Sequence, residues 1–185
     1  MGITLNKDGN IEVNKSMETS VPGLYALGDA TGGWMLIHAS SSMGITAAEN
    51  AMGKMSTLLF HLVPPGIWTF PEVGAVGLSE DEAEKQGIDI EIGDFPYSIN
   101  GLAMARGEVD GALKIVSDSR YAEIPGVHIV GVNATELIPG AVLAIQLEAT
   151  VRELSRSMCV HPTFSEAVVD AAQEAENWAL YLPRR

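Results

Sequence analysis

The run Pro64-Pro65-Gly66 constrains the fold of this chain more than any other feature, because consecutive prolines cannot continue a helix. Before it, from Ser40 to about Leu62, the sequence has no proline and is rich in Ala, Met and Leu. After it, short strand-like segments come first and helical segments follow. We therefore predict a domain boundary here, between residues 1–62 and residues 64–185.

Short strand-like segments open the first unit. Residues 3–5 and 11–13 are predicted to pair around a turn at Asp8-Gly9, a dipeptide typical of tight hairpins. Residues 24–27 form a short apolar run that suits a buried strand, and the glycine-rich segment 28–33 follows it. Two hairpin strands and one buried strand do not enclose a core.

A helix is predicted for the rest of this unit, from Ser40 to about Leu62. Apolar side chains recur there at four-residue spacing, which favours a helix with one apolar face: Met43, Ala47, Ala51 and Met55. One helix and three short strands are the material of a partial domain. We interpret this unit as the end of a larger α/β domain.

The second unit begins with strands. Five segments have strand-like patterns: 67–70, 73–76, 88–92, 112–116 and 127–130. Between the second and third, Ser79 and Glu82 have the spacing of a capping box, and Gly87 is a stop signal, which predicts a short helix.

Two longer helices are predicted after the last strand. The first covers about 134–158, with Leu143, Ile145, Leu147 and Leu154 facing inward, and the second starts at Pro162 and ends near Trp178. Strands followed by helices predict an α+β domain whose antiparallel sheet is covered on one side by helices.

Composition excludes several classes of protein. The 24 acidic and 11 basic residues give a net charge of -13, which argues against nucleic-acid binding. The single cysteine, Cys159, excludes a disulfide framework and an internal redox dithiol, and the four histidines show no metal-ligand spacing. No apolar run reaches the ~18 residues of a membrane span. The polar opening segment lacks a signal-peptide pattern, so we expect a cytoplasmic protein without a metal site.

Asp29 is the first candidate binding residue. It follows an apolar strand-like run and Gly28, which places a carboxylate at the carboxyl end of a predicted strand, where ligands bind in open α/β sheets. Such a carboxylate accepts hydrogen bonds from the hydroxyls of a ribose or ribityl group. The alternative is an Asp that only caps its own turn.

His161 and Glu166 are the candidate catalytic pair. Pro162 fixes the position of His161 just outside a predicted helix, and Glu166 lies in that helix close enough to orient an imidazole. A carboxylate partner makes His a better general base near neutral pH. The alternative is a helix cap with a partly buried His. Cys159 lacks the third group of a Cys–His nucleophile, so we do not assign it that role.

Taken in order, these segments resemble the C-terminal part of the flavin-dependent pyridine nucleotide–disulfide oxidoreductases, most closely the dihydrolipoamide dehydrogenases. The resemblance covers essentially the whole chain. It is carried by ETSVPGLYALGD (18–29), MLIH (35–38), AAEN (47–50), WTFPEVGAVGLSEDEA (68–83), INGLAMARGEVDGALKIV (99–116), GVHIVGVNATELI (126–138) and HPTFSEAVVDAA (161–172).

The resemblance implies a role for each candidate residue. Asp29 would bind the ribityl chain of FAD, and the flavin edge would be lined by Met35, Leu36, Ile37 and His38. His161 would exchange a proton with a thiol, with Glu166 as its orienting partner. It also implies NAD as the electron acceptor, a homodimer whose partner completes each redox-active centre, dihydrolipoamide as substrate, and a 2-oxoacid dehydrogenase or glycine-cleavage complex as a possible partner.

The chain lacks other parts of that family's machinery. It has no G-x-G-x-x-G, no C-x-x-x-x-C disulfide and no NAD-binding domain. We therefore expect a C-terminal piece: a remnant of an FAD-binding domain (1–62) joined to an interface domain (64–185), inactive alone and without retained FAD. The alternatives are a dimerisation module without catalysis, or a piece of a glutathione or mercuric reductase.

Overall fold

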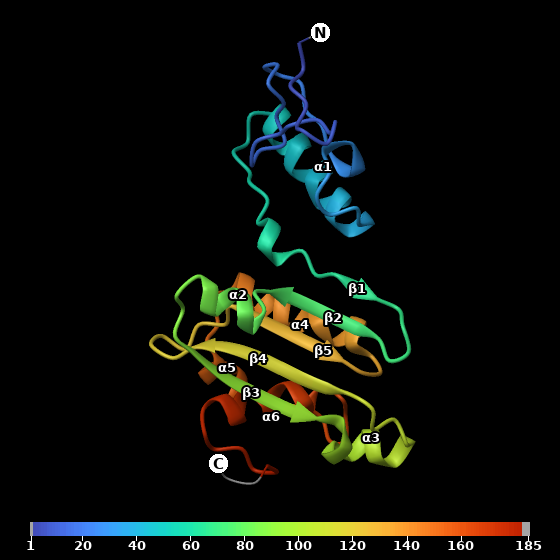
Figure 1. Cartoon of the computed structure of the whole chain (residues 1–185), viewed down its shortest axis with the longest axis vertical. Helices are drawn as coiled ribbons and strands as arrows, with labels where there is room; N and C mark the ends of the chain where they lie inside the picture. Colours follow the sequence, from blue (N-terminus) through green and yellow to red (C-terminus); the bar gives the residue numbers. More distant parts are fainter. Residues whose placement is uncertain (1, 183–185) are drawn as a thin grey trace. The chain divides into compact units, whose positions relative to one another are not determined.

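The computed structural model describes residues 2–182 (Figure 1). Contacts between residues divide the chain into two compact units, Met1–Val63 and Pro64–Arg185, so the change of pattern at the prolines coincides with a change of contacts. Each unit has its own buried cluster of apolar side chains.

Within residues 2–63 the structure has one α-helix, α1 (Ile37–Ala51), and two 3-10 turns, η1 (Gly28–Thr31) and η2 (Phe60–Leu62). The buried residues Met17, Met43 and Ala47 form its core, with Val13, Tyr25 and Leu58 packed against them. This core is small, in keeping with the little regular structure around it.

Two predictions for the first unit are wrong. The predicted strands are reduced to isolated bridges, Leu5 to Ile11 and Glu18 to Tyr25, because no continuous strand lies beside them within residues 2–63. The predicted helix ends at Ala51, since Gly53 adopts a φ of +80° that leaves the helical path. Met55, expected on the buried face, is 96% exposed.

The second unit is built on a five-stranded antiparallel sheet, which confirms the predicted fold class. Its strands lie in the order β1-β2-β5-β4-β3. They are β1 (Gly66–Ile67), β2 (Val73–Gly77), β3 (Ile90–Pro96), β4 (Ala112–Asp118) and β5 (Gly126–Val130). β1 is shorter than the predicted 67–70, because residues 68–72 turn the chain back so that Ile67 pairs with Val73.

Up to residue 182, the described part of this unit also has five helices and one 3-10 turn: α2 (Glu80–Lys85), η3 (Tyr97–Ile99), α3 (Gly101–Arg106), α4 (Ala134–Gln146), α5 (Val151–Ser155) and α6 (Glu166–Ala175). The capping box of Ser79 and Glu82 at α2 is confirmed. Helices α4 and α6 pack against the sheet, α4 on β2 and β5 and α6 on β3 and β4, while α5 packs on α6 (Figure 1).

The long helix predicted for 134–158 is two helices. Glu148 has a φ of +55°, and Thr150 starts α5 with a capping box to Glu153. Of the side chains predicted to face inward, Leu143 and Leu147 are 56% and 70% exposed, whereas Ile145 and Leu154 pack against the core.

The last helix begins later than predicted, at Glu166 instead of Pro162. Residues 161–165 instead form a loop, in which the Glu166 carboxylate accepts a hydrogen bond from the N–H of Thr163 at 2.8 Å. The helix ends at Ala175, before Asn177, whose φ is +60°.

The backbone of α6 lies directly on β3 at Gly93. A Cβ added to Gly93 would lie 1.9 Å from the carbonyl oxygen of Ala171, so only glycine allows this approach. The buried face of α6 consists largely of alanines, Ala167, Ala171, Ala172 and Ala175, which permits the same closeness. This contact sets the height of α6 above the sheet.

We predict that Gly93→Ala lowers the free energy of unfolding by about 3 kcal/mol, because the new methyl group collides with backbone and not with a flexible side chain. Chemical denaturation of the chain measures this. Gly140→Ala, in α4, is the matched control, since nothing lies within 4 Å of its added Cβ. It should be neutral or stabilising by about 0.5–1 kcal/mol. Equal effects of the two substitutions would contradict the close packing of α6.

Candidate active site between α3 and α6

His161 and Glu166 lie in direct contact. The Nδ1 atom of His161 is 2.9 Å from Oε1 of Glu166. A proton on Nδ1 makes this a hydrogen bond donated to the carboxylate, and Nε2 then carries the free lone pair of a base. The His161 side chain is 75% exposed and that of Glu166 only 23%. An exposed imidazole is thus held by a mostly buried carboxylate.

Asn100 anchors the loop that carries His161. Its side chain is buried and donates a hydrogen bond from Nδ2 to the carbonyl oxygen of Thr163 at 3.0 Å. Its Oδ1 accepts from the N–H groups of Leu102 and Ala103, both at 3.1 Å, and so caps α3. One side chain therefore joins the start of α3 to the loop before α6.

Phe164 provides the apolar anchor of the same loop. It is buried, and its ring centroid lies 5.3 Å from that of Tyr97. The Arg106 guanidinium carbon lies 5.9 Å from the centroid of the Phe164 ring, a cation–π contact from the end of α3. Burial raises the pKa of Tyr97 to about 12, with a smaller contribution from the charge of Glu72. Tyr97 is therefore neutral at any ordinary pH and serves as packing.

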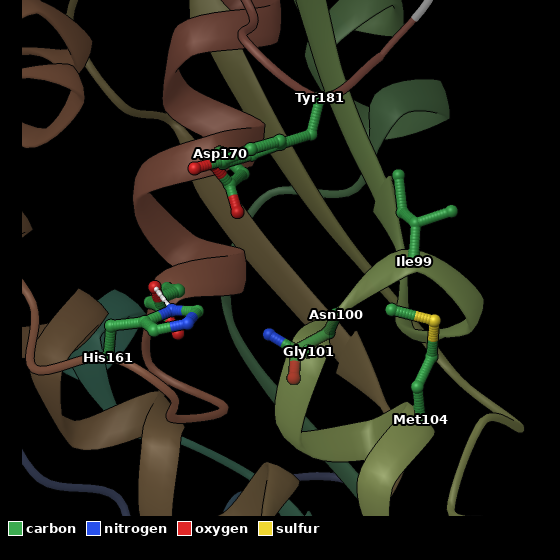
Figure 2. Close-up of a pocket in the computed structure, with 8 residues that line it drawn as sticks. Ile99, Asn100, Gly101, Met104, His161, Asp170 and Tyr181 are labelled. Carbon is green, nitrogen blue, oxygen red and sulfur yellow. Dashed lines mark hydrogen bonds and ion pairs between the residues drawn. The ribbon is translucent and has the colours of Figure 1, made fainter.

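A pocket of about 230 Å³ opens beside the pair (Figure 2). The α3 side contributes Ile99, Asn100, Gly101 and Met104, and α6 and its preceding loop contribute His161, Glu166 and Asp170, with Tyr181 from the C-terminal segment. The α3 wall is uncharged, and the α6 wall carries His161 and the two carboxylates. The pocket therefore places a bound molecule beside His161 and two carboxylates.

Asp170 is a second carboxylate in this pocket, one helical turn after Glu166. It is only 8% exposed. Burial, and then the negative charge of Glu166, raise the pKa of Asp170 to about 6. Its protonation state therefore changes within the range in which many enzymes work.

Cys159 is an exposed residue whose surroundings disfavour its thiolate. Its Sγ lies 3.6 Å from the carbonyl oxygen of Ser165. Burial, followed by the charges of Glu166 and Asp170, raises the pKa of the thiol, so the reactive thiolate is disfavoured. This agrees with leaving Cys159 out of the predicted site.

Asp29 lies in η1 of the first unit and is exposed. Gly28 precedes it with a φ of +67°, and a Cβ there would lie 3.2 Å from Oγ of Ser40, which brings η1 close to α1. An exposed carboxylate beside a helix start suits a ligand with hydroxyl groups.

Met35, Leu36, Ile37 and His38 lie at the start of α1, the helix against which η1 packs. Leu36 is the N-cap and makes no side-chain capping hydrogen bond, and Met35 and Ile37 are 66% and 85% exposed. Exposed apolar side chains next to an uncapped helix start fit the edge of a flat aromatic ring with acceptor atoms, such as a flavin. The five candidate cofactor residues therefore gather in one part of the first unit.

Asn100 and Asp170 are site residues that the sequence did not reveal. Asn100 is a residue type typical of the first position of a helix. Asp170 lies four residues after Glu166 and therefore shares a helix face with it. Neither signal indicates a role in the site until α3 and α6 are seen to face the same pocket. Across the described range 2–182, no cluster of His, Cys, Asp and Glu could hold a metal ion, and no helix is long and apolar enough to span a membrane.

Comparison with known proteins gives a consistent result. The family model "pyridine nucleotide-disulphide oxidoreductase, dimerisation domain" matches residues 63–172, and "pyridine nucleotide-disulphide oxidoreductase" matches residues 1–44. A dihydrolipoyl dehydrogenase of Thermus scotoductus is 40% identical over 184 residues, which cover 100% of this chain and 40% of the relative. That of Halobacterium salinarum is 37% identical over 185 residues, covering 100% of this chain and 39% of the relative.

The solved structures agree with this. LpdA from Mycobacterium tuberculosis superposes with a TM-score of 0.88 and 28% identity, over 94% of this chain and 38% of that one. RclA, a flavoprotein disulfide reductase from Escherichia coli, shares the fold with a TM-score of 0.83 and 23% identity, over 93% of this chain and 40% of that one. The chain thus spans about 40% of the length of these relatives.

We predict that Asn100→Ala lowers the free energy of unfolding by about 2 kcal/mol, because it removes one hydrogen bond to the His161 loop and the cap of α3. Hydrogen exchange of the amides in 161–166 should quicken in the same variant. Thr150→Ala is the control, since it removes a cap of similar strength at α5. If both variants quickened exchange in 161–166 equally, Asn100 would not be a specific anchor.

The raised pKa of Asp170 makes stability depend on pH. The group favours the folded state fully below its unfolded pKa of about 4 and loses this contribution as pH rises through about 6. We predict that Asp170→Asn, compared with the unmodified chain, gains about 2–3 kcal/mol of unfolding free energy between pH 4 and pH 7.5. Urea denaturation at several pH values measures this. A difference between the two proteins that does not change with pH would contradict it.

Proposed function

The chain belongs to the pyridine nucleotide-disulphide oxidoreductase family, and from this premise we propose that it forms the part of a dihydrolipoyl dehydrogenase that supplies the acid/base pair His161–Glu166 and the dimer interface. The observation that carries the proposal is the 2.9 Å contact between Nδ1 of His161 and Glu166, within the segment that matches the dimerisation domain. The relatives' names support dihydrolipoamide as the substrate.

In the proposed reaction His161 moves a proton to and from a substrate thiol. Glu166 holds Nδ1–H, so that Nε2 accepts the thiol proton and the carboxylate stabilises the imidazolium that forms. The substrate thiolate then attacks a disulfide sulfur, forming a mixed disulfide and releasing a second thiolate. The remaining substrate thiol then attacks the substrate sulfur of the mixed disulfide, which closes the product disulfide and releases the other sulfur of the attacked disulfide as a thiolate. The substrate thus loses two electrons and two protons, and the attacked disulfide becomes a dithiol.

The attacked disulfide must come from outside this sequence. The chain has one cysteine, Cys159, and a disulfide needs two sulfurs. The reaction therefore needs a larger protein, which in our proposal is a homodimer, as the match to a dimerisation domain supports. We also propose a cytoplasmic enzyme, with a 2-oxoacid dehydrogenase or glycine-cleavage complex as the source of its substrate.

FAD and NAD are the cofactors of the proposed enzyme. When bound, FAD would supply two-electron transfer between the reduced dithiol and NAD. Asp29 would accept hydrogen bonds from the ribityl hydroxyls, and Met35, Leu36, Ile37 and His38 would lie along the flavin edge. The exposure of Met35 and Ile37 supports this, since both lack cover within residues 2–63.

The first experiment determines the DNA sequence directly upstream of the Met1 codon. We expect an open frame that encodes G-x-G-x-x-G and C-x-x-x-x-C, and the protein it encodes should oxidise dihydrolipoamide with NAD. Oxidation of reduced glutathione in place of dihydrolipoamide would favour the glutathione reductase alternative. An in-frame stop codon there would contradict the proposal and favour a dimerisation module without catalysis.

We predict that His161→Gln in that protein lowers kcat by about 10²–10⁴-fold, because the thiol loses its general base. Glu166→Gln should lower kcat less, since the base remains and only its orientation and charge support are lost. Stopped-flow kinetics at several pH values would measure both. Glu91→Gln, an exposed residue of β3, is the control and should keep full activity. Full activity of His161→Gln would overturn the assignment.

A further inference from the structure

Asp170 is an acidic group that the proposed reaction does not use, although it lines the same pocket as His161 (Figure 2). It lies one turn after Glu166 on α6, so the two carboxylates share a helix face. At 8% exposed, it is more than nine-tenths buried.

The two carboxylates have different hydrogen bonds. Both oxygens of Glu166 accept donors: Oε1 lies 2.9 Å from Nδ1 of His161, and Oε2 accepts the N–H of Thr163 at 2.8 Å. Within residues 2–182, no donor makes a hydrogen bond with the carboxylate of Asp170. Asp170 is therefore the carboxyl in this pocket that can gain or lose a proton without breaking an existing contact.

We propose that Asp170 is a positioning residue that acts through Glu166 on His161: once ionised, it adds a second negative charge behind the pair and strengthens the hold of His161 on a proton. When Asp170 is protonated, only the charge of Glu166 faces the imidazole. The pair would thus take protons from thiols more readily above the titration of Asp170 than below it. This inference rests on the proposed function in taking His161 as the proton-transferring group.

The surroundings of Asp170 make Glu166 its main charged neighbour. The pKa of Asp170, raised to about 6 by burial and by Glu166, agrees with a coupled pair. The loop before α6 contributes His161 and Cys159. The charges of both carboxylates contribute to the raised pKa of the Cys159 thiol. The pocket residues from η3 and α3 are uncharged (Ile99, Asn100, Gly101, Met104), and Arg106 of α3 lies over the Phe164 ring. The residues of β3 and β4 on the α6 side are also uncharged (Gly93, Phe95, Leu113, Ile115). The C-terminal segment contributes Tyr181, and Arg152 of α5 is paired with Glu176.

The test is an NMR titration of the 185-residue chain itself. The Hε1 signal of His161, assigned by its loss in His161→Gln, is followed from pH 4.5 to pH 9 in the unmodified chain and in Asp170→Asn. We expect the His161 titration to move to lower pH in Asp170→Asn, while the His128 titration stays in place. Superimposable His161 curves would overturn the proposal.

Asp94→Asn is the matched control. It removes the same charge from β3, but its side chain lies on the sheet face opposite Gly93, which contacts α6. We expect no change in the His161 titration there. An equal change would mean that overall charge, and not the position of Asp170, is responsible, and would overturn the proposal.

A second measurement does not depend on the folding of Asp170→Asn. The side-chain carboxyl carbon of Asp170 should titrate at about pH 6 in the unmodified chain, and at lower pH in Glu166→Gln, where the neighbouring charge is gone. An unchanged Asp170 titration in Glu166→Gln would show that the carboxylates are not coupled.

Failure of this inference is separable from failure of the proposed function. The titrations need no turnover, flavin or NAD, so they report on the coupling alone. Full activity of His161→Gln in the whole enzyme would overturn the proposed function and leave the coupling between the carboxylates as measured.

Discussion

The close approach of α6 to β3 at Gly93 is the constraint on which the candidate site depends. Because the Ala171 carbonyl lies where a side chain would otherwise be, α6 has little freedom to slide or rotate on the sheet. Its buried face is alanine, and Glu166 and Asp170 follow on the side that lines the pocket. A helix fixed by backbone packing can hold two carboxylates near an imidazole, because their positions do not rest on long, flexible side chains.

The sequence predicted the architecture of the second unit better than the limits of its elements. β2, β4 and β5 follow from short strand-like apolar segments, and the start of α2 follows from a Ser with a Glu three positions later. The break between α4 and α5 does not, because residues 134–158 contain strong helix formers, and only the positive φ of Glu148 interrupts them. The strand predicted for residues 24–27 is wrong for a different reason. Its apolar pattern is that of a buried strand, but a strand must also pair with a neighbouring strand, and only the isolated bridge between Glu18 and Tyr25 forms there.

Some residues of the candidate site were likewise predicted from the sequence, and others were not. His161 and Glu166 were predicted as a pair because they lie five positions apart across a proline, although the helix starts at Glu166 and not at Pro162. Asn100 and Asp170 were not predicted, because their roles depend on contacts between segments about sixty residues apart. Local chemistry therefore identified the candidate pair, and only tertiary structure identified the residues that hold its loop and share its pocket.

The exposure of His161 is the remaining feature to explain. The proposed general base would work best where water is excluded. The His161 side chain is nevertheless 75% exposed, and the neighbouring Met158 and Val160 are 99% and 77% exposed. The side chains of Glu166 and Asp170 are therefore mostly shielded from solvent, whereas the imidazole of His161 is not. The proposed dimer accounts for both facts. A partner surface against Met158 and Val160 would cover the apolar side chains and dry the imidazole, and the disulfide that this chain lacks would come to His161 from the same side.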